Sequence, residues 1–248
     1  MRRGLAALAM LLACLLLRLP ATLVDGLLAT AGDGSVRLAW AEGSVWNGRG
    51  RLMVQDPVDR AWQPWMHLAW RFDASRLWRG EIAWQLRDGE KPALAASLSP
   101  QGMALKGVDL AAPAWAVLER LPHALGRAGW RGQWHLQAQA WQCGWDGRCR
   151  GQARLDWQGA AAELLQDRPL GDYALQLEAA GDEYRLRWET PRGEVRISGE
   201  GRWRQGGRPA LAGDIRGDPA LLRRLPGVAG RWVSPGTEPG VWRFSLAG

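Results

Sequence analysis

The chain has 248 residues, enough for one large domain or two small ones with a buried core. Its net charge of +7 comes from arginines that stand singly or in pairs, with no run of four basic residues, and this argues against nucleic-acid binding. Alanine, glycine, arginine, proline and tryptophan are over-represented. Their GC-rich codons account for most of the skew, including part of the 17 tryptophans.

The N-terminal segment has the pattern of a membrane anchor. Two arginines are followed by residues 4–17, which carry no charge, and then by Arg18. A positive start before an apolar run of this length is typical of a secretory signal or an uncleaved anchor. The absence of a good small-residue cleavage pattern close to the run favours the anchor. Because about 20 residues are needed to cross a bilayer, we take the membrane segment as residues 4–24, with Arg18 reaching the far headgroups.

This segment divides the chain into an anchor, residues 1–28, and an exported domain, residues 29–248. The positive-inside rule keeps the N-terminus in the cytoplasm and predicts a single-pass protein. The exported domain is predicted to be mainly β, with antiparallel sheet and one or two short helices. Any internal division is expected near residues 113–125, where a short helix could begin at Pro113. A second short helix is predicted over residues 218–225, with Asp218 as its capping residue.

Alternating apolar residues mark the expected strands, with polar residues on the intervening positions and turn residues between the runs. The clearest runs are Val36–Trp40, Arg51–Val54, Leu68/Trp70/Phe72, Ile82/Trp84/Leu86, Trp134–Ala140, Gln152–Trp157, Tyr173/Leu175/Leu177, Tyr184/Leu186/Trp188, Val195/Ile197 and Trp242/Phe244/Leu246. Five times a tryptophan stands two residues before a glycine, first at Trp46 and Gly48. A tryptophan supplies a large flat surface, and a nearby glycine permits a turn or close approach on a sheet.

The two cysteines outside the anchor flank a predicted hairpin turn. Cys143 and Cys149 stand on either side of Asp146-Gly147, between two strand-like runs. Cysteines at the shoulders of a short hairpin can close a disulfide in an oxidising compartment. Zinc is the competing interpretation, but one cysteine pair without neighbouring cysteines or histidines supplies too few ligands. Cys14, within the apolar run, is interpreted as a small apolar residue.

No catalytic or cofactor-binding pattern stands out. The three histidines, His67, His123 and His135, have no spacing that would place two metal ligands on one helix face. Nucleophile elbows, phosphate-binding glycine loops and dinucleotide fingerprints are missing from the sequence. We therefore predict no enzyme, no cofactor and no metal, although scattered carboxylates could still converge in space. The tryptophan-rich strands could bind lipid or sugar, but core packing is the commoner use of such residues.

Several phrases, taken in order, point to a family. They are the anchor running into Arg18–Ala21, the phrase Gly43-Ser-Val-Trp-Asn-Gly-Arg-Gly50, Trp157–Ala160 followed by Arg168-Pro-Leu-Gly-Asp-Tyr173, and Thr190-Pro-Arg-Gly193 leading into Ile197–Trp203. Together they resemble the type II secretion system protein N family along nearly the full chain. After Trp203 the chain departs from the family's pattern, with extra turns at residues 235–240.

The resemblance implies a non-catalytic accessory subunit of the machine that moves folded proteins from the periplasm to the exterior. Such a subunit is expected in the bacterial inner membrane, single-pass, with a periplasmic domain. Its expected partners are the inner-membrane platform and the periplasmic part of the secretin. The family contributes no catalytic residues, and the matching positions are interpreted as structural: Trp46, Gly48, Gly171, Tyr173, Gly193 and Gly199.

Two other functional classes stay open at this point. A periplasmic lipid-transfer or envelope-maintenance module could use a curved, anchored β-sheet whose apolar face is too long for its own core to cover. A cell-wall hydrolase would need a carboxylate or histidine site that the sequence does not display.

Overall fold

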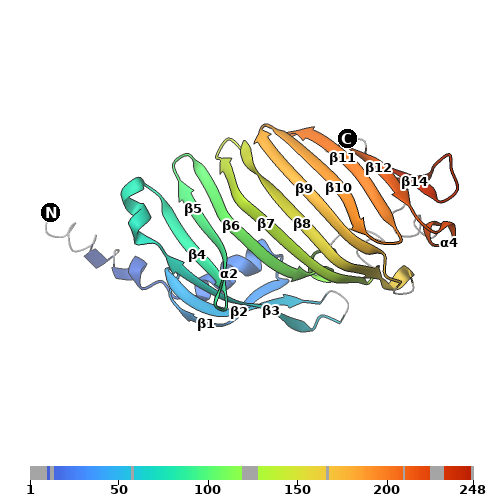
Figure 1. Cartoon of the computed structure of the whole chain (residues 1–248). Helices are drawn as coiled ribbons and strands as arrows, with labels where there is room; N and C mark the ends of the chain where they lie inside the picture. The colour runs from blue at the N-terminus through green and yellow to red at the C-terminus, as the bar shows by residue number, and fades with distance from the viewer. Residues whose placement is uncertain are drawn as a thin grey trace. The chain divides into compact units, whose positions relative to one another are not determined.

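The computed structural model describes residues 10–11, 14–56, 59–118, 128–165, 168–208, 210–223 and 232–246. The chain forms two compact units, Met1–Ser99 and Pro100–Gly248 (Figure 1). Each unit is built on antiparallel strands that pair in order along the chain, so the chain is mainly β, with few and short helices, as predicted.

Unit 1 is a five-stranded antiparallel meander with one helix packed on its first strand. Its elements are α2 (Thr22–Ala31), β1 (Val36–Gly43), β2 (Asn47–Gln55), β3 (Trp62–Phe72), the 3-10 helix η1 (Ala74–Arg79), β4 (Ile82–Asp88) and β5 (Lys91–Ser99). Leu38, Leu52, Val54 and Trp70 are among its buried residues. They occupy alternate positions, as expected for strands with one covered face.

Unit 2 carries the remaining strands. Its elements are β6 (Gly102–Pro113), α3 (Trp115–Leu118), β7 (Trp130–Gly144), β8 (Cys149–Ala162), η2 (Glu163–Leu165), β9 (Gly171–Gly181), β10 (Glu183–Arg192), β11 (Arg196–Arg204), β12 (Ala210–Arg216), α4 (Pro219–Leu222), β13 (Val233–Pro235) and β14 (Val241–Leu246). Figure 1 shows β6 to β12 side by side in chain order, and β14 then pairs with β12 and leaves β13 at the edge.

The apolar core of unit 2 lies toward one end of its strands. Trp157, Tyr173 and Phe244 contribute its large rings, and Leu221 and Leu222 of α4 pack with them. The α4 helix forms where predicted, because Asp218 accepts a hydrogen bond from the Ala220 amide and Pro219 occupies the first turn. Short helices therefore cover this end of the sheet.

Large side chains of the sheet lie across glycines of the neighbouring strand. Gly48 is paired with Trp70, and a Cβ at Gly48 would come within 2.4 Å of that indole. In unit 2 the ring of Phe244 covers Gly199 and Gly213 in the same way. A ring packed against a glycine buries apolar surface without a second layer of structure. Aromatic residues and glycines are therefore used together here, with the ring on one strand packing against the glycine on another.

The sequence prediction is confirmed for the strands with clear alternation, whereas β5, β6, β12 and β13 were not predicted. Small residues make up much of β5 and β6, so they show little contrast between faces. The predicted helix near residues 113–125 is described only to Leu118, where α3 ends, and residues 119–127 lie outside the described residues.

The predicted membrane segment, residues 4–24, is described in part, since residues 4–9 and 12–13 lie outside the described residues. Within the described part of the chain, no helix combines the length and apolarity needed to cross a membrane. Residues 22–24 belong to α2, and Pro20 forms a β-bridge with Ser44.

Candidate functional site

The sequence Gly43–Gly50, which includes the loop between β1 and β2, forms hydrogen bonds with the N-terminal segment. The Val45 amide donates to the Leu19 carbonyl at 3.0 Å, and the Ala21 amide donates to the Gly43 carbonyl at 3.1 Å. The indole Nε1 of Trp46 donates to the Leu16 carbonyl at 2.8 Å. Three hydrogen bonds therefore join three residues of the N-terminal segment, Leu16, Leu19 and Ala21, to one loop of unit 1. We call this set of contacts the N-terminal junction.

A cluster of aromatic residues supports the junction from the sheet. The Trp46 ring lies 5.0 Å from Phe72 and 6.3 Å from Trp84, centroid to centroid. Trp70 Nε1 lies 3.1 Å from the carbonyl oxygens of both Ser44 and Val45. Indole donors thus satisfy backbone carbonyls that a tight loop leaves without strand partners.

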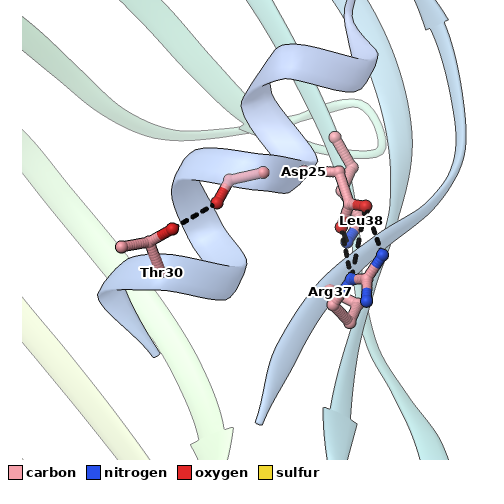
Figure 2. A network of polar contacts seen from close by, with 5 residues as sticks. Asp25, Thr30, Arg37 and Leu38 are labelled. Carbon is pink, nitrogen blue, oxygen red and sulfur yellow. Dashed lines mark hydrogen bonds and ion pairs between the residues drawn. The ribbon is translucent and has the colours of Figure 1, made fainter. Parts of the chain in front are cut away.

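Asp25 of α2 forms a second connection, to the start of β1 (Figure 2). Its carboxylate accepts from Arg37 Nε at 3.0 Å and from Arg37 Nη2 at 2.8 Å, and it also accepts from the Leu38 amide at 2.7 Å. The hydrogen bonds from Arg37, followed by the one from Leu38, outweigh partial burial and hold the pKa of Asp25 below its usual value. A lowered pKa means that the carboxylate stabilises the folded state above its unfolded pKa. That contribution is lost as the pH falls through the folded pKa.

Replacing Asp25 by alanine should loosen α2 from β1. The variant loses the acceptor for the Leu38 amide and its bidentate partner on Arg37, and we expect a cost of about 1–2 kcal/mol, since the exposed ion pair itself contributes little. Hydrogen exchange of the α2 amides measures the effect. Asp25→Asn keeps an oxygen for Leu38 and should retain part of the protection. Equal protection in the wild type and Asp25→Ala contradicts the assignment.

Gly171 and Gly193, from two different family phrases, lie against each other where β9 begins and β10 has just ended. A Cβ on Gly171 would come within 2.7 Å of the Gly193 Cα and 2.4 Å of the Arg192 carbonyl oxygen. A Cβ on Gly193 would come within 2.5 Å of the Leu170 carbonyl oxygen. Both glycines have φ near +145°, a conformation that L side chains rarely adopt. The close approach of these two backbone segments therefore requires glycine at both positions.

Tyr173 connects the same two phrases through its side chain. It is 2% exposed, its ring lies 5.7 Å from Trp157, and its hydroxyl donates to the Val195 carbonyl at 3.0 Å. Burial, followed by the nearby charge of Asp172, raises the pKa of Tyr173 far above its usual value. The hydroxyl therefore stays protonated, and able to donate, above the pH at which an exposed tyrosine ionises.

That raised pKa predicts a loss of stability in alkali. Above pH ~10 an unfolded tyrosine releases its proton while the folded one keeps it, so the stability conferred by Tyr173 falls as pH rises. Tyr173→Phe should cost about 1 kcal/mol at neutral pH. Its unfolding free energy should then fall less steeply than the wild type's above pH ~10, by up to about 1.4 kcal/mol per pH unit. Parallel curves for the two proteins, measured by denaturant titration, contradict the prediction.

The disulfide predicted between Cys143 and Cys149 is present in the structure, with an S–S distance of 2.04 Å. It closes the hairpin between β7 and β8, and other contacts hold that hairpin against later strands. Gln205 Nε2 donates to the Asp146 carbonyl at 2.8 Å, and the Tyr184 hydroxyl donates to the Gly147 carbonyl at 3.3 Å. The turn is therefore fixed to β10 and to the end of β11 as well as by the covalent bond.

A depression of about 800 Å³ crosses the strands β6 to β11 of unit 2. Arg154, Arg185, Arg187 and Arg202 line it, together with glutamines and the acidic residues Asp109, Glu178 and Glu200. Cross-strand neighbours in it carry opposite charges, as in Arg187 and Glu200, whose atoms Nε and Oε1 lie 3.6 Å apart. Val108, Leu177 and Leu186 also line the depression, so its surface mixes charged and apolar side chains.

The described residues hold no group of three or more histidine, cysteine, aspartate or glutamate side chains able to bind a metal ion. His135 contacts Asp109, and His67 stands alone on β3. His123 lies outside the described residues.

Sequence reasoning placed Trp46 and Gly48 in one motif but missed their partners. Trp70, which covers Gly48, is 22 residues further along the chain and belongs to none of the five Trp-x-Gly copies. Asp25 lies within residues 1–28, which the sequence analysis assigned to the anchor, and it was not singled out there. The signal that could have found it is a carboxylate on a short helix ahead of an arginine-bearing strand.

The family described as "Type II secretion system (T2SS), protein N" has a model that matches residues 34–236 of this chain. No curated protein and no solved structure matches it significantly.

Proposed function

Because the chain belongs to the type II secretion system protein N family, we propose that it is a non-catalytic accessory subunit of the type II secretion machine. The observation that carries the proposal is the extent of the family match, which runs from just before β1 to β13 and so includes most of both units. The subunit is tethered in the inner membrane by its apolar N-terminal segment, and its β-rich domain lies in the periplasm.

The proposed partners are the inner-membrane platform and the secretin, reached through sheet edges and exposed aromatic residues. An edge strand offers backbone donors and acceptors to which a partner can add a strand. In unit 1, β1 pairs with β2 on one side only, and it carries Trp40, which is 68% exposed at φ +50°. A tryptophan in that conformation is strained, and strain of this kind is commonest at functional positions.

The structural interpretation of the six family positions supports this role. Trp46 and Gly48 serve the N-terminal junction, Gly171, Gly193 and Tyr173 join two strands, and Gly199 lies under Phe244. All six either allow two backbone segments to come close together or pack an aromatic ring, and both are structural roles.

A deletion strain tests the proposal. We expect exported hydrolases to vanish from the culture supernatant and to accumulate folded in the periplasm, and a plasmid copy of the wild-type gene to restore export. The supernatant proteome of the deletion strain against its parent is the measurement. A second plasmid copy carrying Glu90→Ala, a change at an exposed, non-aromatic position of the β4–β5 turn, controls for expression. Unchanged export in the deletion strain overturns the proposal.

A lipid-transfer or envelope-maintenance module is the alternative, and the same strain separates the two. If export is normal while the strain becomes sensitive to detergent, the lipid function replaces the secretion function. The apolar residues that line the depression in unit 2, Val108, Leu177 and Leu186, are the observation that supports this alternative, because acyl chains require apolar contacts.

A further inference from the structure

The 3-10 helix η1 presents a tryptophan to solvent from a rigid support. Trp78 is 95% exposed, and its neighbour Leu77 is 51% exposed. Exposed tryptophans need a reason, because burying one stabilises a protein by several kcal/mol at about 25 cal/mol per Å². A flexible loop can expose a tryptophan that has no function. The interactions that hold η1 in place therefore have to be considered.

Both ends of η1 are capped, and its middle is held by ion pairs. Asp73 accepts from the Ser75 amide at the start, and Gly80 closes the end at φ +69°. Arg76 Nη1 lies 3.1 Å from the Glu81 carboxylate, and Arg76 Nε lies 3.8 Å from that of Asp73. The fold therefore fixes Leu77 and Trp78 in an outward position.

The strand directions place η1 at the same end of unit 1 as the N-terminal junction. The β1–β2 loop and the β3–β4 connection occur at one end of the antiparallel meander, and the β4–β5 turn occurs at the other. Direct contacts agree with this. Trp46, which binds the Leu16 carbonyl, has its ring 5.0 Å from Phe72, and η1 begins two residues after Phe72.

No linker separates the N-terminal apolar segment from this end of the sheet. Leu15, Leu16 and Leu17 are exposed, Arg18 follows, and the Ala21 amide is already bonded to Gly43. An extended residue spans at most ~3.6 Å, so a membrane that holds the leucines lies within a few residues' reach of the junction. The end of the sheet that carries η1 must then face the bilayer surface.

We propose that Leu77 and Trp78 insert into the membrane interface and form a second lipid contact of unit 1. Tryptophan favours the headgroup region, where its ring is half solvated. Arg79, exposed beside it, suits the phosphates of anionic lipids. The two contacts, one at the anchor and one at η1, fix the tilt of unit 1 against the bilayer. This inference rests on the proposed membrane tether.

Fluorescent labels on the full-length protein in vesicles test the contact. The variant Cys14→Ser removes the exposed thiol, and the Cys143–Cys149 disulfide does not react. An environment-sensitive dye is then placed by Leu77→Cys beside the intact Trp78, by Leu11→Cys in the apolar segment, or by Glu90→Cys at the β4–β5 turn. The vesicles contain phosphatidylethanolamine and phosphatidylglycerol, with nitroxide lipids carrying the quencher at headgroup depth or deep in the acyl chains.

We expect headgroup nitroxide to reduce the emission at position 77 by about twofold, as for a group at the interface, and to leave position 90 unchanged. Adding Trp78→Ser should abolish most of the quenching at position 77. Position 11 should respond to the deep quencher, which reports the tether by itself. If position 77 behaves like position 90 while position 11 is quenched, the second contact is overturned and the tether stands. If position 11 is not quenched, the tether fails, and quenching at position 77 alone still establishes the lipid contact.

Discussion

Gly171→Ala is expected to lower the free energy of unfolding of unit 2 by about 2–4 kcal/mol. The new methyl group meets the Arg192 carbonyl oxygen at 2.4 Å and the Gly193 Cα at 2.7 Å, both of them backbone atoms that cannot rotate away. The residue also keeps a φ of +145°, which adds strain for any L side chain. Relief requires β9 and β10 to move apart, and that breaks the hydrogen bond from Tyr173 to Val195.

The matched control for this change is Gly181→Ala, in the hairpin between β9 and β10. Gly181 also has a positive φ, +79°, but nothing lies within 4 Å of a Cβ there. It should cost only about 1 kcal/mol, the conformational part of the effect. Hydrogen exchange of the β9 and β10 amides, with denaturant titration, measures both variants. Equal losses at the two positions would show that the close approach contributes nothing.

Trp46→Ala is expected to detach the N-terminal segment from unit 1. The change removes the hydrogen bond to the Leu16 carbonyl and the ring packing on Phe72 and Trp84, at a cost of about 3 kcal/mol. Limited proteolysis should then cut the chain between Arg18 and the start of α2, where the wild-type chain is protected by its bonds to the β1–β2 loop.

Two further variants separate the contributions of Trp46. Trp46→Phe keeps a ring against Phe72 but has no donor for Leu16, so we expect a loss of about 1 kcal/mol and intermediate protection. Trp40→Ala removes an exposed indole and should leave the cleavage pattern unchanged. If Trp46→Phe is cut as readily as Trp46→Ala, the hydrogen bond alone holds the segment.

Local patterns in the sequence predicted much of the fold. Alternation identified β3 and β4, and Asp146-Gly147 placed the turn at which the disulfide forms. Among the strands that escaped prediction, β5, β6 and β12 are rich in alanine or glycine, so their two faces differ little in hydrophobicity, and β13 has only three residues. Alternation of apolar and polar residues shows which face of a strand a side chain lies on. It does not show whether another part of the chain covers that face.

The candidate site depended on contacts that no local pattern encodes. The junction needs the Leu16 carbonyl, the Trp46 indole and Phe72 to meet, and these residues are widely separated in the chain. The pairing of Gly171 with Gly193 likewise depends on strand register. Register follows from the whole sheet, and a one-residue shift would move every side chain to the opposite face.

The pairing of each strand from β1 to β5, and from β6 to β12, with its successor in the chain has a consequence for biogenesis. A polypeptide synthesised from its N-terminus can form such a sheet one hairpin at a time, because the strand with which each new strand pairs has already been made. Among the strands that the structure describes, β13 departs from this order, since it pairs with β14, which must first reach β12. Synthesis and folding can therefore proceed together until the last two strands, and β13 pairs only after β14 has been made.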